Sequence, residues 1–184
     1  MNLLKIALLQ IAPCNTINKN IDKGIKYCRK AKEMGADIVL FPEMWSNGYR
    51  IYDRDVEAWK KEAIDINSDF VLCFSKLAKE LNMAIGLTIL EKYEHNPRNT
   101  MILFDRYGEQ KLVYAKVHTC AFDVERNLTP GEDLEISMNN VRNVSNSLQF
   151  KGTLSAINLY LKEQQNRYFI YDPNLYKLNE KDFV

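Results

Sequence analysis

Three apolar segments, separated by two stretches of helical periodicity, constrain the fold of this chain more than any other feature. The apolar segments are residues 3–11, "ADIVLF" (36–41) and "MAIGLTIL" (83–90). Continuous apolar runs of this length are typical of strands that are covered on both faces. Between them, apolar residues recur at helical spacing in two segments, of which one stops at Gly35 and the other begins at Ser68, a residue that can cap a helix.

A hairpin is predicted after the third strand. The segments "NTMILF" (99–104) and "KLVYAK" (111–116) flank "DRYGEQ", in which Gly108 can take the positive φ of a tight turn. The order of strand, helix, strand, helix, strand and hairpin predicts an α/β layered domain. Residues 135–184 lack this alternation and are rich in asparagine. We therefore predict two parts, a folded part over residues 1–134 and a divergent segment over residues 135–184.

Composition narrows the class of protein. The 184 residues suffice for one domain with a sizeable core. The 25 basic and 24 acidic side chains nearly balance, which argues against a nucleic-acid binder. No apolar run reaches the roughly 18 residues that span a bilayer, so no membrane association is expected. The N-terminus lacks the cleavage site of a signal peptide, and the four cysteines lack CxxC or zinc-type spacing. A cytoplasmic protein with reduced thiols is expected.

Charged residues that could act in catalysis lie at or after the ends of predicted strands. Glu43 follows the second strand, and α/β enzymes commonly display catalytic groups at the carboxyl ends of strands. Lys116 ends the hairpin, and Glu125 precedes a Pro-Gly turn. Each of these residues alone is more often a cap or a solvated surface residue. His95 and His118 are the only histidines, so a metal site has few ligands to draw on and no metal is expected.

Taken in order, several segments resemble one known family. "ADIVLFPEMWSNGY", "YAKVHT" and "ERNLTPGED" are similar to signature regions of the nitrilase, or carbon–nitrogen hydrolase, superfamily. "KIALLQIAP" and "LAKELNMAIGLTILEK" resemble its opening strand and its third-strand region, so that the resemblance covers residues 3–134. It implies an α/β fold, here an incomplete nitrilase-like α-β-β-α sandwich with one half clearly present. It also implies hydrolysis of non-peptide C–N bonds in small amides, carbamoyl compounds or nitriles, without metal or organic cofactor.

The resemblance implies roles for individual residues. Glu43 corresponds to the general base, Lys116 to the cation that stabilises the tetrahedral intermediate, and Glu125 to a supporting acidic residue. Trp45 and Tyr49 are candidates for the walls of a substrate pocket, although packing explains them equally well. A small amide or carbamoyl substrate is the expected partner. Members of the family commonly dimerise, so a homo-oligomer is a further expectation.

The nucleophile implied by the resemblance has no counterpart. The family places a cysteine roughly 30–40 residues beyond the lysine, in a motif of the form "ICYDxxFPE". The corresponding window here, around "NSLQFKGTLSA", contains no cysteine, and none follows Cys120. Cys120 stands only four residues after Lys116, too near to align with the nucleophile. Thr153 and Ser155 lie in the window but lack the flanking motif.

Three functions are compatible with at least part of this sequence pattern. The first is a carbon–nitrogen hydrolase that is active in its full-length form, and the second is a non-catalytic binding or assembly protein that keeps the hydrolase scaffold. The third is an unrelated α/β module that binds a nucleotide. The sequence disfavours the third, because neither GxGxxG nor GxxxxGK[ST] follows any predicted strand.

Overall fold

The computed structural model describes residues 5–48, 55–119 and 123–132, and the structural statements below refer to these residues. The described elements are β1 (Ile6–Leu8), α1 (Ile17–Glu33), β2 (Ile38–Leu40), α2 (Val56–Lys60), α3 (Asp69–Leu81), β3 (Ala84–Glu91), β4 (Arg98–Phe104), β5 (Gln110–Ala115) and the 3-10 helix η1 (Asp123–Asn127). The predicted order of strand, helix, strand, helix, strand and hairpin is thereby confirmed, and α2 is a short helix between β2 and α3.

The five strands form one mixed sheet in the order β1-β2-β3-β4-β5. Strands β1, β2 and β3 run parallel, and β3, β4 and β5 are joined by antiparallel pairing. The parallel pairs are connected through α1 and α3, as expected for parallel strands, which need a crossover. The described part is therefore an α/β fold with a five-stranded mixed sheet. The second sheet of the predicted sandwich is not among the described residues.

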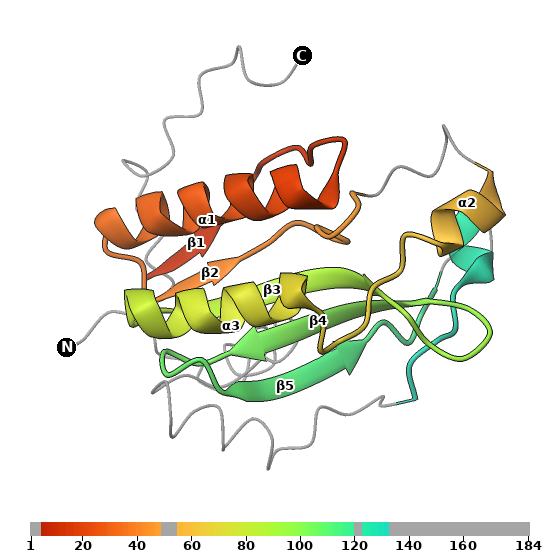
Figure 1. Ribbon diagram of the computed structural model, residues 1–184. Helices are drawn as coiled ribbons and strands as arrows, with labels where there is room; N and C mark the ends of the chain where they lie inside the picture. Colours follow the sequence, from red (N-terminus) through yellow and green to blue (C-terminus); the bar gives the residue numbers. More distant parts are fainter. Residues whose placement is uncertain (1–4, 49–54, 120–122, 133–184) are drawn as a thin grey trace.

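Helices α1 and α3 lie side by side on one face of the sheet (Figure 1). Their apolar residues join those of β2, β3 and β4 in the largest hydrophobic cluster, which includes Cys28, Val39, Phe74, Ile85 and Ile102. Gly24 of α1 faces the ring of Phe74, and a Cβ atom there would approach the ring to 2.7 Å. This close approach explains a glycine inside a helix, where it otherwise costs about 1 kcal/mol relative to alanine.

The boundaries of some elements differ from the predictions. Strand β1 comprises only Ile6–Leu8, whereas residues 3–11 were expected, of which 3 and 4 lie outside the described residues. Ser68 stands at the N-cap of α3 as predicted, but its side chain makes no capping hydrogen bond. Gly35, with φ +82°, follows the end of α1 as the sequence indicated. The predicted segment 135–184 lies outside the described residues, so its boundary stays a prediction.

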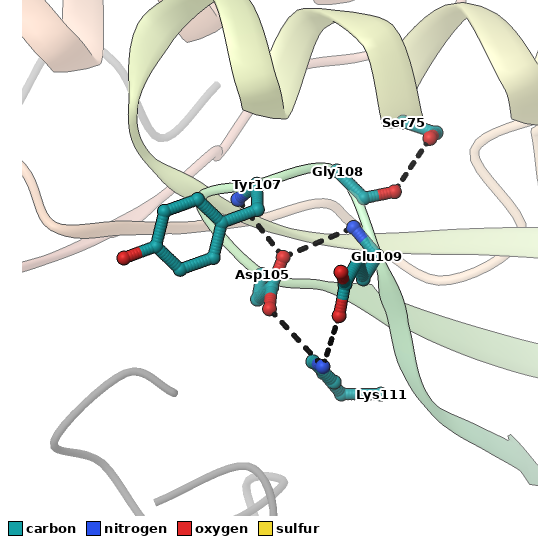
Figure 2. A network of polar contacts seen from close by, with 6 residues as sticks. All are labelled: Ser75, Asp105, Tyr107, Gly108, Glu109 and Lys111. Atoms are coloured by element: carbon teal, nitrogen blue, oxygen red, sulfur yellow. Dashed lines mark hydrogen bonds and ion pairs between the residues drawn. The ribbon is translucent and has the colours of Figure 1, made fainter. Parts of the chain in front are cut away.

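The β4–β5 hairpin turns around a buried carboxylate, Asp105, which is 0% exposed (Figure 2). Its Oδ1 accepts hydrogen bonds from the backbone N–H groups of Tyr107 (2.9 Å) and Glu109 (3.0 Å), and Lys111 Nζ lies 3.4 Å from Oδ2. Gly108 has φ +80°, as the sequence predicted, and its carbonyl accepts a 2.7 Å hydrogen bond from Ser75 of α3. The turn is thus fixed to the helix layer through Ser75 of α3.

None of the helices in residues 5–48, 55–119 and 123–132 combines the length and the apolar character needed to cross a bilayer. Within the same ranges, no three His, Cys, Asp or Glu side chains gather closely enough to hold a metal ion.

Candidate active site

The sheet topology brings four chain segments to one edge. Strands β2 and β3 are parallel and end at this edge, β4 is antiparallel to β3 and begins there, and β5 returns to end there. Glu43, Asn99 and Lys116 stand at or just beyond these strand ends. The predicted site residues are therefore neighbours in space because of the strand directions, although they are distant in the sequence.

The segment that carries Glu43 is held rigidly on both sides. The Thr88 hydroxyl of β3 donates to the carbonyl of Pro42 and accepts a 3.1 Å hydrogen bond from the N–H of Trp45. Immediately after Glu43, Met44 has φ +50°, a left-handed conformation that is rare for a bulky residue. Such backbone strain clusters at functional sites, where the surrounding structure imposes it. The chain therefore turns sharply after presenting the Glu43 carboxylate.

A buried asparagine in α1 fixes the same turn from the other side. Asn20 is 1% exposed, and its Nδ2 donates to the carbonyls of Trp45 and Ser46, each at 3.2 Å. Its Oδ1 accepts a hydrogen bond from the backbone N–H of Cys14, so one side chain links the segment after β1 to the segment after β2. Loss of this link would free the backbone next to Glu43.

Lys116 and Glu125 are positioned by backbone hydrogen bonds between β5 and the segment after it. The N–H of Lys116 donates to the carbonyl of Asn99 (2.8 Å), and the N–H of Gly131 donates to the carbonyl of Lys116 (2.9 Å). A Cβ atom on Gly131 would collide with the carbonyl oxygen of Ala115, so only glycine permits this approach. The segment from η1 to Gly131 therefore lies directly against the end of β5 and carries Glu125 to Lys116.

The three charged residues form one cluster in which the lysine bridges two carboxylates. Lys116 Nζ lies 2.7 Å from Glu125 Oε1 and 3.1 Å from Glu43 Oε1. The side chain of Glu125 is 2% exposed, that of Lys116 32% and that of Glu43 48%. Glu125 is thus the buried anchor, and Glu43 is the member open to solvent. The three residues for which the resemblance implies roles, Glu43, Lys116 and Glu125, thus meet at the Lys116 ammonium, while their roles stay predictions.

The electrostatics of the cluster keep Lys116 protonated. Partial burial lowers the pKa of Lys116, but the hydrogen bonds and negative charges of Glu125 and Glu43 outweigh burial, and its net pKa is raised above the ordinary value. An ammonium with a raised pKa does not act as a base near neutral pH. Two of its three N–H donors point at carboxylates in the described part of the chain, and the third can bind an oxygen of a ligand.

Of the two residues predicted to line a substrate pocket, Trp45 lies among the described residues and Tyr49 does not. Trp45 is 1% exposed and its ring packs on Phe41 at 5.3 Å between centroids, within the main hydrophobic cluster. This placement agrees with the packing alternative for Trp45. Tyr49 lies outside the described residues. His118 is exposed and is not part of the described hydrogen bonds of the cluster.

The described cysteines are poor candidates for a nucleophile in this cluster. Burial raises the pKa of Cys28 to about 12, despite the opposing charge of Arg29, and burial also raises the pKa of Cys73. Cys73 borders a surface hollow of about 410 Å³ between α1 and α3, and Cys14 borders one of about 400 Å³ beside α1. Neither hollow is lined by a residue of the charged cluster. Cys120 lies outside the described residues.

One residue of the site was not predicted from the sequence. Asn99, at the start of β4, is 8% exposed and donates from Nδ2 to Glu43 Oε1 at 2.5 Å. The sequence contains a weak signal for it, since a polar amide opens an otherwise apolar strand. That pattern alone does not separate a functional amide from a residue that simply ends a loop.

Comparisons with known proteins agree on one family. Residues 5–146 match the model of the carbon–nitrogen hydrolase family. The chain is 25% identical over 115 residues to an N-carbamoylputrescine amidase of Oryza sativa subsp. japonica, covering 62% of this chain and 38% of the relative. It is 28% identical over 138 residues to an omega-amidase of Bos taurus, covering 74% of this chain and 48% of the relative. The chain thus spans less than half the length of these relatives.

Solved structures support the fold. A carbon–nitrogen hydrolase from Helicobacter pylori G27 matches with a TM-score of 0.62 at 20% identity, covering 71% of this chain and 46% of that chain. The NitFhit protein of C. elegans matches with a TM-score of 0.60 at 18% identity, covering 72% of this chain and 35% of that chain. Because the family model spans more than half of the residues, this chain belongs to the carbon–nitrogen hydrolase family.

Proposed function

We propose that the cluster of Glu43, Lys116 and Glu125 supplies the base and the cation of a hydrolase site for small amides or carbamoyl compounds. The observation that carries this proposal is the position of Lys116 Nζ, within 3.1 Å of one carboxylate and 2.7 Å of another. Relatives described as an omega-amidase and an N-carbamoylputrescine amidase support this substrate class.

The cluster fits the proton and charge movements of amide hydrolysis. Glu43, about half exposed, accepts the proton of a thiol, whose sulfur forms a bond to the amide carbon. Negative charge then develops on the amide oxygen, and the ammonium of Lys116 offsets it. The carboxyl group of Glu43 returns the proton to the leaving nitrogen as the C–N bond breaks. Water next cleaves the thioester and releases the acid.

Glu125 has a supporting role in this scheme. It is 1% exposed and lies 2.7 Å from Lys116 Nζ, so its carboxylate keeps the ammonium charged and oriented. Since Lys116 remains protonated, the more exposed Glu43 is the group suited to exchange protons with a substrate. This division gives the two carboxylates different tasks because their environments differ.

The thiol of this scheme has no counterpart at the family position in the sequence given. A second candidate function, binding of an amide without cleavage, is favoured by that single observation. The two functions share the cluster and differ in the acyl-transfer step alone, so they can be separated experimentally.

The proposed roles can be tested in a fused protein, made of residues 1–134 of this chain followed by the remaining C-terminal part of the bovine omega-amidase. We expect the fused protein to release ammonia from small amides and the Glu43→Gln variant to lose about 10²–10⁴-fold in rate, the usual contribution of a general base. Glu80→Gln on α3, an exposed residue paired with Arg29, serves as the control and should leave the rate unchanged. A folded fused protein in which Glu43→Gln turns over normally would rule out Glu43 as the base.

A further inference from the structure

The two oxygens of the Glu43 carboxylate have different surroundings. Oε1 receives two donors, Lys116 Nζ at 3.1 Å and Asn99 Nδ2 at 2.5 Å. Within the described part of the chain, the hydrogen bonds and ion pairs of Glu43 all involve Oε1. The side chain of Glu43 is 48% exposed, and no hydrogen bond within the described residues goes to Oε2.

Asn99 is itself held firmly enough to orient another side chain. It lies in β4, paired in register with Leu90 of β3, and is 8% exposed. Its backbone carbonyl accepts the N–H of Lys116 at 2.8 Å, while its side chain contacts Glu43. One residue therefore fixes the base through its side chain and the cation through its backbone.

The chemistry of an amide suits this task. A primary amide donates hydrogen bonds but carries no charge and does not ionise near neutral pH. It can hold one carboxylate oxygen without competing as a base and without changing the net charge of the cluster. A second lysine in this place would instead add a positive charge beside Lys116.

We propose that Asn99 is the positioning residue of this site, holding Oε1 of Glu43 beside Lys116 and leaving Oε2 as the oxygen that accepts the proton. This proposal deepens the proposed function and rests on it for the role of Glu43 as the base. The amide of Asn99 fixes the orientation of the Glu43 carboxylate. Without this amide, the half-exposed Glu43 side chain samples other rotamers, and its contact with Lys116 loosens.

The test measures how strongly Glu43 and Lys116 are coupled, by NMR titration of the Lys116 side chain. Glu43→Gln is expected to lower the pKa of Lys116, because it removes a neighbouring negative charge. The same substitution in an Asn99→Leu background should lower the pKa of Lys116 by much less. Coupling of undiminished size in the Asn99→Leu background would overturn the proposal.

A matched control lies one residue further along β4. Thr100 is 0% exposed and its hydroxyl donates to Glu91 Oε2 at 2.5 Å, so it also holds a glutamate from this strand. Successive strand residues point to opposite faces, which places Thr100 away from Glu43. Thr100→Val should therefore leave the coupling between Glu43 and Lys116 unchanged. Equal loss in Thr100→Val and Asn99→Leu would show a general loosening of β4 and would overturn the proposal.

A second measurement needs no variant and covers the case in which Asn99→Leu fails to fold. A scalar coupling across the hydrogen bond, from Asn99 Nδ2 to the carboxylate carbon of Glu43, is expected in the unmodified protein, and its absence would overturn the proposal. The outcomes also separate this proposal from the proposed function. Coupling between Glu43 and Lys116 that depends on Asn99 would support the positioning role of Asn99. If Glu43→Gln then had no effect on turnover of the fused protein, that second result would refute only the catalytic role of Glu43.

Discussion

Replacement of Lys116 by methionine is expected to lower the free energy of unfolding by about 3 kcal/mol, near the lower end of the range for breaking a buried ion pair. The loss arises mainly at Glu125, whose side chain is 2% exposed and lies 2.7 Å from the ammonium. Removing the ammonium takes away the ion pair that this buried carboxylate makes with Lys116. The lower end of the range applies because the side chain of Lys116 is 32% exposed and partly screened by water.

Urea denaturation at neutral pH measures this loss. Trp45 and Trp59 are each 1% exposed, so their fluorescence reports the unfolding of the core. Arg29→Met provides the control, because the Arg29–Glu80 pair is about half exposed on both sides, so its loss should lower the free energy of unfolding much less. Adding Glu125→Gln to Lys116→Met should recover part of the lost free energy of unfolding. Equal costs for Lys116→Met and Arg29→Met would contradict the assigned burial of the cluster.

The stabilisation by Lys116 should also depend on pH in a defined direction. Its pKa is raised in the folded state, so the folded protein binds this proton more tightly than the unfolded chain does. The contribution is fully present below the ordinary lysine pKa of about 10.4 and is lost as the pH rises through the higher folded value. On the alkaline side, the difference in stability between the unmodified protein and Lys116→Met should therefore shrink as the pH rises through the folded pKa of Lys116.

The parts of the fold that the sequence predicted are those that local patterns determine. The apolar run of β3 and the periodicity of α1 require no knowledge of distant residues. Gly108 was predicted as a positive-φ turn residue because few other residues tolerate that conformation. The convergence of Glu43 and Lys116 follows from strand directions, but the family motifs were needed to select these two residues from many charged ones.

The parts that the sequence did not predict depend on contacts between distant segments. Asn99 acts on a residue 56 positions away, and a lone amide at a strand start carries no periodic signal. Asn20 was likewise missed, because the polar residues 15–20 predict a connecting loop, whereas α1 begins at Ile17 and Asn20 is 1% exposed. The burial of Glu125 results from the hydrogen bond of Gly131 to Lys116, which brings the two segments together.

The second large expected effect concerns catalysis by the 184-residue chain itself. We expect it to release ammonia from small amides at a rate several orders of magnitude below that of a complete site, the usual cost of removing one member of a catalytic triad. The cluster retains a base and a cation, but the covalent step needs a thiolate. Cys28 has a pKa of about 12 and is 0% exposed, so it provides essentially no thiolate at neutral pH.

The most direct measurement combines ammonia release with intact-mass detection of acyl adducts, carried out in parallel on the 184-residue chain and on the fused protein. We predict background ammonia release and no adduct for the chain, and turnover with an adduct on the added C-terminal part for the fused protein. Turnover by the chain with an adduct on Cys14, Cys28, Cys73 or Cys120 would identify a nucleophile that we have dismissed. Turnover without a cysteine adduct would instead indicate Thr153, Ser155 or a water molecule as the nucleophile. It would equally contradict the claim that the site lacks only its thiol.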